Sequence, residues 1–389
     1  MEDGGSKSDS PSSILHLPFI FRQSPMKKKI RVAILFGGRS AEHEISLISA
    51  RNIAEAINKE KYEIVSIGID KQGRWFFDEG ARLLCGGDQA RVEFGRRDQP
   101  AAIVPGAMQT PIARLGPRRL PGNIDVVFPV LHGPFGEDGT VQGLLKLAEV
   151  PFVGAGVIGS AVGMDKDVMK RLLRDAQVPI AKFLAFESTA KGKIRFAEVK
   201  RALGMPVFVK PANLGSSVGI SKVSHPRQFP GAVKDAFRYD NKILIEESID
   251  GREIECSVLG NENPVASLPG EIITRHDFYS YDAKYIDDRG AQLIIPAELP
   301  KRVVARIQQL ALKTFKTLCC EGMARVDFFL RDRNEIFVNE INTIPGFTKI
   351  SMYPKLWAAS GLSYTDLIDR LIQLALRRFL GEKQLRSSI

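Results

Sequence analysis

Residues 325–342 read RVDFFLRDRNEIFVNEIN and predict two strands of alternating apolar residues joined by a tight turn. Successive side chains of a strand point to opposite faces, so Glu340 and Asn342 share one face and Ile341 points away from it. Asp327 can lie beside them on the neighbouring strand. Such oxygen ligands suit Mg²⁺, which usually takes its remaining ligands from water and nucleotide phosphates. An edge hairpin with a solvated acidic face explains the spacing equally well, so both interpretations stay open.

The composition is that of an ordinary globular protein, and 389 residues are enough for two or three domains with buried cores. A formal net charge of +10 would suit an acidic partner such as nucleic acid. However, the basic residues form short doublets and one triplet, without zinc-finger spacing, an RNP-like aromatic motif or a long basic helix. We therefore predict a solvated basic surface and no nucleic-acid partner, with a few cations available to an anionic small ligand.

The cysteines and the apolar segments indicate a cytoplasmic protein. No C-x-x-C pair occurs, and Cys319 and Cys320 are adjacent, which is a poor geometry for mutual bridging. No apolar run approaches the roughly 18 residues of a membrane span, so no membrane partner is expected. Residues 1–25 lack the basic start and long apolar centre of a signal peptide, and we expect a disordered leader or an added extension there.

The N-terminal part alternates buried strands with helices, which predicts a parallel α/β sheet in a first domain over residues 26–154. Residues 78–121 mix Gly, Pro and Arg without a clear period, so we expect them to be irregular and assign them no role. The elements expected in this domain are strands at 30–36, 62–70 and 124–129 and a helix at 44–58.

The remaining sequence predicts a small central α+β domain over residues 155–245 and a C-terminal domain over residues 246–389. A single helix at 160–177 is expected, with the apolar Val168, Leu172 and Leu173 on one side. The other expected elements are strands at 206–211, 242–247, 253–259, 264–268, 323–330 and 336–341, and helices at 195–203, 301–318 and 364–379.

A phosphate site is predicted where Lys210 ends a buried strand and the loop Gly215-Ser-Ser-Val-Gly219 follows. Glycines let backbone N–H groups approach anionic oxygens, hydroxyls add donors, and the lysine supplies a point charge. The lysine precedes the glycines, so the segment is not a Walker P-loop. A flexible hairpin turn is the alternative. Lys166 could add a second positive charge, or it could be an ordinary surface lysine.

Four other segments carry polar residues whose role their own sequence leaves open. Glu42 follows the first strand and can bind an ammonium group, or it can belong to a helix N-cap region. The strand ending at Glu246 and Glu247 can meet an adenine and a ribose, or simply expose its acids. Residues 279–285 can form a lid over an active site. The glycine and backbone N–H groups of residues 342–352 can serve an oxyanion.

Taken together, these motifs resemble the ATP-grasp superfamily and, within it, the D-alanine–D-alanine ligase family. The resemblance extends from Met26 to about Arg378 and implies α/β and α+β domains in a three-domain ATP-grasp architecture. The matching motifs are Gly37-Gly-x-Ser-Ala-Glu42, His132-Gly133, Gly136-Glu-Asp-Gly139, Met164-Asp-Lys166, Lys210-Pro, Gly215-Ser-Ser-Val-Gly219, Ala283-Lys-Tyr285, Arg325-Val-Asp327 and Glu340-x-Asn342-Thr-x-Pro-Gly346.

The resemblance also implies a role for each motif residue. The implied ATP ligands are Lys166, Lys210 and Ser217 at the phosphates, Glu246, Glu247 and Ile249 around the adenine, and Glu253 at the ribose. Two Mg²⁺ ions, for which Mn²⁺ can substitute, are implied at Asp327, Glu340 and Asn342. The implied catalytic residues are Glu42, Ser216 and Tyr285 around the first ammonium, and Arg325 and the Gly346 N–H at the oxyanion. The implied substrate ligands are His132 for the first amino acid, and Lys284, Ser351 and Met352 for the second carboxylate.

The implied activity is the ATP-dependent joining of two D-alanines through a D-alanyl phosphate, for peptidoglycan precursor synthesis in a cytoplasmic homodimer. The alternative is an enzyme that joins D-alanine to D-lactate. The Lys284-Tyr285 pair argues against this alternative. A non-catalytic ATP sensor is a further alternative. The set of Arg325, Asp327, Glu340 and Asn342 argues against it, because a sensor needs no oxyanion donor.

Overall fold

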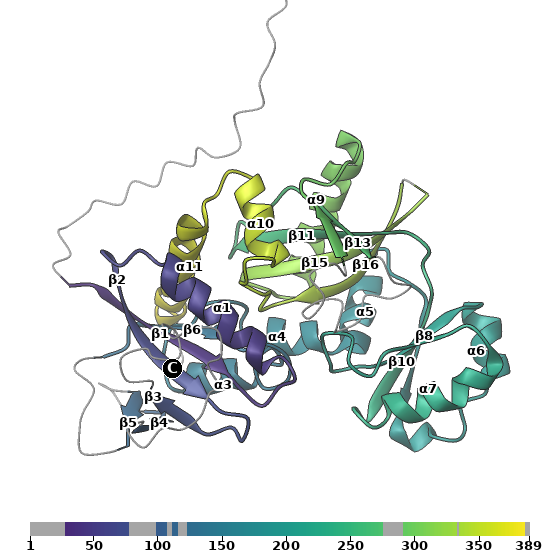
Figure 1. Cartoon of the computed structure of the whole chain (residues 1–389), viewed down its shortest axis with the longest axis horizontal. Helices are drawn as coiled ribbons and strands as arrows, with labels where there is room; N and C mark the ends of the chain where they lie inside the picture. Colours follow the sequence, from purple (N-terminus) through teal and green to yellow (C-terminus); the bar gives the residue numbers. More distant parts are fainter. Residues whose placement is uncertain are drawn as a thin grey trace, which may run out of the picture.

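The computed structural model describes residues 28–77, 99–106, 111–115, 123–274, 291–332 and 334–385. It contains three β-sheets, each covered by helices, with α4 (Val157–Met164) and α5 (Lys166–Asp175) at the centre of the molecule (Figure 1). None of the helices within these ranges is long and apolar enough to cross a membrane. The leader predicted at 1–25 lies outside the described residues.

The first sheet has the order β5-β4-β3-β2-β1-β6. Its strand β1 is parallel to β2 and to β6, which confirms the predicted parallel α/β arrangement. The apolar run of β1 is buried on both faces, because α1 and the C-terminal helix α11 (Tyr364–Lys383) cover one side and α3 the other. The elements are β1 (Ile30–Gly37), α1 (His43–Ala56), β2 (Tyr62–Ile69), β3 (Trp75–Phe77), β4 (Gln99–Ile103), β5 (Ile112–Arg114), β6 (Val126–Val130) and α3 (Thr140–Leu147).

The strands β4 and β5 correct the expectation that residues 78–121 are irregular. Both are short antiparallel additions to the sheet, and β4 is only partly buried. Because neither strand has a continuous apolar face, the sequence gives little period to detect. The other residues of that segment lie mostly outside the described ranges.

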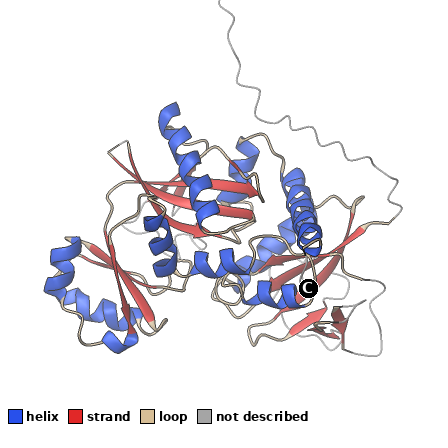
Figure 2. Ribbon diagram, turned by 180° about the vertical axis from the view of Figure 1, so that it is seen from behind, coloured by secondary structure: helices blue, strands red, loops and turns tan. Residues whose placement is uncertain are grey.

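The second sheet is antiparallel, with the order β7-β10-β8-β9. Its helices pack on the outer side of the sheet and form a separate core with it (Figure 2). The elements are β7 (Phe183–Glu187), η2 (Ser188–Ala190), α6 (Phe196–Leu203), β8 (Val207–Pro211), β9 (Ser221–Val223), η3 (Pro226–Gln228), α7 (Phe229–Ala236) and β10 (Lys242–Glu247).

The third sheet has the order β14-β13-β11-β15-β16, with β12 paired to β11. The helix α9 packs against this sheet and buries one apolar face on it, and the helix expected at 301–318 is confirmed. The elements are β11 (Arg252–Gly260), β12 (Val265–Ala266), β13 (Gly270–Thr274), β14 (Ala291–Ile294), α9 (Lys301–Thr317), β15 (Gly322–Arg331), β16 (Glu335–Asn342), α10 (Met352–Ala359) and α11 (Tyr364–Lys383).

The single helix predicted at 160–177 is wrong, because the chain forms two helices, α4 (Val157–Met164) and α5 (Lys166–Asp175). Asp165 separates them, and its carboxylate accepts hydrogen bonds from the first-turn amides of α5. The predicted apolar side is also partly wrong, because Val168 and Leu172 are 36% and 38% exposed. Leu173 is buried, on the same side as Lys170.

The buried apolar side of α5 packs with the third sheet, because Met169 and Leu173 lie in the same apolar cluster as residues of β11 and β15. The second sheet has its own core, formed between residues 184 and 245. The division into domains at residues 154 and 245 stays a prediction.

Candidate active site

The acidic hairpin lies in the third sheet. Asp327 pairs with Glu340, and Arg325 pairs with Asn342, across β15 and β16. Ile341 is buried in the apolar core on the other face of the sheet. The prediction that the two acids and the amide share one face is therefore confirmed.

Arg325 organises the carboxylates on this face. Its guanidinium donates hydrogen bonds to both oxygens of Asp327, each at 2.7 Å. Its Nε also lies 2.8 Å from Oε2 of Glu255, which faces Asp327 across β11 and β15. Asn342 Nδ2 donates to Asp327 Oδ2 at 3.0 Å. Sequence reasoning missed Glu255, although its alternation with Glu253 in β11 could have placed it on this face.

The donor set on this face fits a hard cation. Within the described ranges, no three His, Cys, Asp or Glu side chains cluster closely enough to hold a metal ion by themselves. Two facing carboxylates and an amide oxygen, from Asp327, Glu340 and Asn342, leave several coordination positions of Mg²⁺ to other oxygens. Such a set suits a metal that nucleotide phosphates help to bind.

The predicted phosphate loop follows β8, at the end of which Lys210 is nearly buried. Ser216 and Ser217 both have the left-handed backbone that non-glycine residues rarely adopt, with φ of 50° and 60°. The Ser216 hydroxyl donates a hydrogen bond to Oε1 of Glu42, at the start of α1. The loop and the first domain's predicted ammonium ligand are therefore in direct contact.

Lys166 connects the phosphate loop with the acidic hairpin. Its Nζ donates to the Leu214 carbonyl at 2.7 Å and lies 3.5 Å from Oε2 of Glu340. The side chain is 8% exposed, so it is not an ordinary surface lysine. Two motifs separated by more than a hundred residues therefore meet at one ammonium group.

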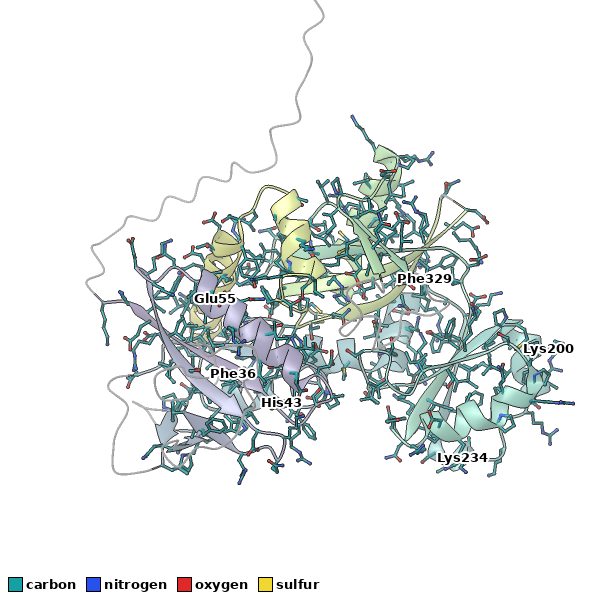
Figure 3. All side chains as sticks on the ribbon, in the orientation of Figure 1. Phe36, His43, Glu55, Lys200, Lys234 and Phe329 are labelled. Carbon is teal, nitrogen blue, oxygen red and sulfur yellow. The ribbon has the colours of Figure 1, made fainter. Side chains whose placement is uncertain are left out.

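A buried cluster of two lysines and one carboxylate is formed by residues of α5, β8 and β10. Lys170 Nζ is 2.7 Å from Glu246 Oε1, and Lys210 Nζ contacts Oε2 of the same carboxylate. Burial raises the pKa of Glu246, but the two ammonium groups outweigh it and lower this pKa to about 2. By contrast, Lys200 and Lys234 lie on the outer helices of this part, exposed to solvent (Figure 3).

The other predicted nucleotide ligands follow β10 and begin β11. Glu247 Oε1 accepts a hydrogen bond from the Lys182 amide at 2.7 Å, so its carboxylate holds the chain that enters β7. Ile249 is buried, and Glu253 pairs with Phe329 across β11 and β15. These residues border the junction between the second and third sheets.

Glu42 and His132 belong to two loops at the same edge of the first sheet. Gly133 has a φ of +75°, and a Cβ added to it would lie 2.8 Å from Ser40 Oγ and 3.2 Å from Oε2 of Glu42, so this position favours glycine. His132 is 5% exposed, and its Nδ1 lies 3.0 Å from the Ile344 carbonyl and 3.7 Å from Glu137 Oε1. Burial lowers the pKa of His132, but the Glu137 and Glu42 carboxylates outweigh it and raise this pKa overall.

The loop that carries Gly346 is anchored at Phe347, whose side chain is fully buried. The Phe347 amide donates to Ser49 Oγ at 3.2 Å. The Phe347 carbonyl accepts hydrogen bonds from Asn52 Nδ2 at 3.1 Å and from Tyr364 Oη at 2.7 Å. Sequence reasoning missed these anchors, because nothing in α1 indicates which of its polar residues face a loop three hundred positions away.

Ser351 and Met352 begin α10 beside the same loop. Ser351 Oγ accepts a hydrogen bond from the Thr348 amide at 2.9 Å, and a Cβ added to Gly346 would lie 2.7 Å from it. The Met352 side chain packs against Ile272 in a small apolar cluster, so only its backbone is available to a ligand. The predicted substrate ligand Lys284 and the predicted catalytic residue Tyr285 lie outside the described residues.

Two family descriptions match most of this chain. Residues 31–155 match "D-ala D-ala ligase N-terminus", and residues 172–373 match "D-ala D-ala ligase C-terminus". The chain is 54% identical over 364 residues to a D-alanine–D-alanine ligase from Oceanobacillus iheyensis, an alignment that spans 93% of this chain and 99% of the relative.

Solved structures show the same likeness. The D-alanine–D-alanine ligase from Coxiella burnetii is 41% identical, with a TM-score of 0.80 over 92% of this chain and 96% of that chain. A D-Ala:D-Ser ligase from Enterococcus faecalis is 35% identical, also with a TM-score of 0.80, over 90% of this chain and 100% of that chain.

Proposed function

Because this chain belongs to the D-alanine–D-alanine ligase family, we propose that it joins two D-alanines to D-alanyl-D-alanine with ATP as the energy source. The product would serve peptidoglycan precursor synthesis. Relatives that are about 50% identical in sequence over nearly their whole length support the activity. The solved ligase structures support the ATP-grasp fold on which this activity depends.

The nucleotide would lie at the junction of the second and third sheets. Lys166 and Lys210 would neutralise its phosphates, together with the hydroxyl and backbone donors of Ser217. Glu246 would accept from the adenine amino group, beside the backbone of Glu247 and Ile249, and Glu253 would accept from the ribose. The donor and acceptor character of each group supports this arrangement.

Two Mg²⁺ ions would bind at Asp327, Glu340 and Asn342, and Mn²⁺ could replace them. When bound, the ions would offset the negative charge that develops on the transferred phosphoryl group. The oxygen-only donor set supports this part of the proposal.

The reaction would proceed in two steps. Glu42 would hold the ammonium of the first D-alanine, so that its carboxylate attacks the γ-phosphorus, and ADP leaves to give D-alanyl phosphate. The deprotonated amine of the second D-alanine would then attack the carbonyl carbon and displace inorganic phosphate. Arg325 and the Gly346 N–H would stabilise the oxyanion of the tetrahedral intermediate. Positioning and charge neutralisation carry most of such a transfer.

The second substrate would bind near the start of α10. Its carboxylate would accept from Ser351 and from the Met352 N–H, with Lys284 as a further cation. His132 would line the first-substrate site. Its contacts with the Ile344 carbonyl and with Ser49 favour an additional part in holding the loop that carries Gly346.

The contact that carries the proposal is the hydrogen bond from Ser216 to Glu42. It joins the phosphate loop to the carboxylate that would hold the first ammonium. An amino acid bound at Glu42 would therefore have its own carboxylate close to a nucleotide's terminal phosphate, which is the arrangement that acyl phosphate formation requires.

The test is product analysis with purified protein, ATP and Mg²⁺. We expect phosphate release with D-alanine and little with L-alanine, and a product of the mass of D-alanyl-D-alanine. D-lactate and D-serine in competition with D-alanine identify the acceptor, because each gives a product of different mass. Absence of any dipeptide would refute the proposed function, and a mainly depsipeptide product would replace it by ester formation.

We also propose that the protein works as a cytoplasmic homodimer, as the family resemblance implies. Sedimentation velocity tests the assembly. A species of the monomer's mass over the working concentration range would contradict the dimer, without bearing on the reaction.

A further inference from the structure

Lys170 is a buried cation that the mechanism above does not use. It lies on α5, and its side chain is 1% exposed. Its Nζ is 2.7 Å from Glu246 Oε1, while Lys210 holds the other oxygen of that carboxylate. One carboxylate is therefore shared by two ammonium groups, of which only that of Lys210 belongs to the strand that leads into the phosphate loop.

Charge balance makes the contribution of Lys170 specific. Taking an ammonium group out of water is unfavourable unless a carboxylate compensates it. Accordingly, burial lowers the pKa of Lys170, although Glu246 and Glu340 act against this shift. If Lys170 lost its charge, Glu246 would have Lys210 as its sole ammonium partner within this cluster. The remaining pair would be closely neutralised, and Lys210 would be less available to a phosphate.

Lys170 also connects two parts of the molecule. Its neighbours Met169 and Leu173 pack with the third sheet, whereas Glu246 and Lys210 lie on β10 and β8 of the second sheet. The orientation of Glu246 is therefore fixed from the opposite side of the junction at which the nucleotide would bind.

We propose that Lys170 is a positioning residue for the nucleotide, which holds one oxygen of Glu246 so that this carboxylate can meet the base and Lys210 can meet the phosphates. The inference rests on the proposed function for the identity of the ligand. Lys170 itself would touch neither the base nor the phosphates, and it would have no part in binding D-alanine.

A second contact across the same junction supplies a matched control. Lys242 on β10 lies 2.6 Å from Asp165 and 3.4 Å from Asp167, at the start of α5. It joins α5 to the second sheet as Lys170 does, but its ion pairs are with these two aspartates. Lys242→Met therefore weakens the junction without freeing Glu246.

The experiment measures ADP binding by calorimetry for the wild type, Lys170→Met, Lys170→Arg and Lys242→Met. We expect Lys170→Met to weaken ADP binding by about tenfold or more, as for loss of a charge-assisted contact. Lys170→Arg should recover part of this affinity, and Lys242→Met should bind ADP like the wild type. In steady-state assays, KM for ATP should rise in Lys170→Met, while KM for D-alanine stays within about twofold.

A double-mutant cycle with Glu246→Gln tests whether Lys170 acts through that carboxylate. In the Glu246→Gln background, Lys170→Met should add little further loss of ADP affinity. If Lys170→Met folds poorly, the same cycle is run with Lys170→Arg. Additive losses of ADP affinity in the double mutant, or equal losses of ADP affinity in Lys170→Met and Lys242→Met, would overturn the inference. Lys170 would then only connect two parts of the fold.

The two proposals fail in different ways. A wild-type protein that binds ADP but forms no dipeptide would refute the reaction and leave the comparison of Lys170 variants intact. Normal dipeptide synthesis with unchanged ADP affinity in Lys170→Met would refute the role of Lys170 alone.

Discussion

Replacing Ser49 by Ala should separate the position of the Gly346 loop from the stability of the fold. Ser49 is fully buried and accepts the hydrogen bond of the Phe347 amide at 3.2 Å. Without the hydroxyl, that buried N–H loses its partner, which costs about 1–3 kcal/mol. Alanine is the better helix former, and recovers about 0.5 kcal/mol in α1. We therefore expect the free energy of unfolding to fall by about 0.5–2.5 kcal/mol.

The effect on catalysis follows from what remains of the anchor. The Phe347 carbonyl keeps its hydrogen bonds to Asn52 and Tyr364, so the loop stays in place. The peptide unit between Gly346 and Phe347, whose N–H has lost its partner, can however rotate. Loss of a whole oxyanion donor costs about 10²–10³ in kcat, and a misaligned Gly346 N–H should cost less. We expect kcat to fall roughly tenfold, with KM for ATP unchanged.

The assay is steady-state phosphate release, combined with denaturant unfolding. Thr365→Val is the control, because it removes the bond from Thr365 to the Ala56 carbonyl, which also joins α1 to the C-terminal part of the chain. It should lower stability by about 0.5–1.5 kcal/mol without changing kcat. A Ser49→Ala protein that is destabilised but retains wild-type kcat would refute the reasoning, since the amide anchor would then not position Gly346.

Three further predictions concern the remaining site. Glu340→Gln should reduce kcat by about 100-fold or more while the melting temperature stays near that of the wild type; wild-type turnover would remove this residue from the metal site. Ser216→Ala should raise KM for D-alanine by about tenfold, because Glu42 loses a hydrogen-bond donor. Steady-state rates measured against both substrates test this, and a rise in KM for ATP instead of KM for D-alanine would contradict it. The raised pKa of His132 beside Glu137 gives a stabilising contribution that is fully present below pH 6.5 and is lost as pH rises through the folded-state pKa. Unfolding of His132→Gln measured across this range should show a smaller decline with pH than the wild type, and equal declines would contradict the assignment.

Strand period placed the acidic hairpin correctly from sequence, because one buried face forces a two-residue repeat. It could not reveal the irregularity between Asp327 and Phe328, which sets Glu340 opposite Asp327 and Val338 opposite Phe328. Such a bulge adds one residue to a strand without changing its composition. The types of ligand residue could thus be predicted from the sequence, whereas the register of the two strands is determined only when they pair in the fold.

The helix α5 was misjudged for a different physical reason. Hydrophobic periodicity assigns the buried face to apolar residues, yet Lys166 and Lys170 are buried while Val168 is exposed. The two lysines are compensated by Glu340 and Glu246, which come from other parts of the chain. The hydrophobic periodicity of a segment contains no information about partners from distant parts of the chain. Long-range ion pairs therefore bury lysines that periodicity alone places on the exposed face.

The C-terminal helix α11 shares one apolar core with β1, β6 and α1, at the other end of the chain (Figure 1). Tyr62 Oη donates to Asp369 at 2.7 Å, and Arg378 donates to the Phe152 and Gly154 carbonyls. During synthesis, α1 can cover only part of this face of the first sheet, and the rest stays uncovered until almost the whole chain has left the ribosome. Contacts so distant in sequence slow folding and expose apolar surface meanwhile. The time between translation of β1 and of α11 is thus the interval in which the nascent chain most needs protection from aggregation.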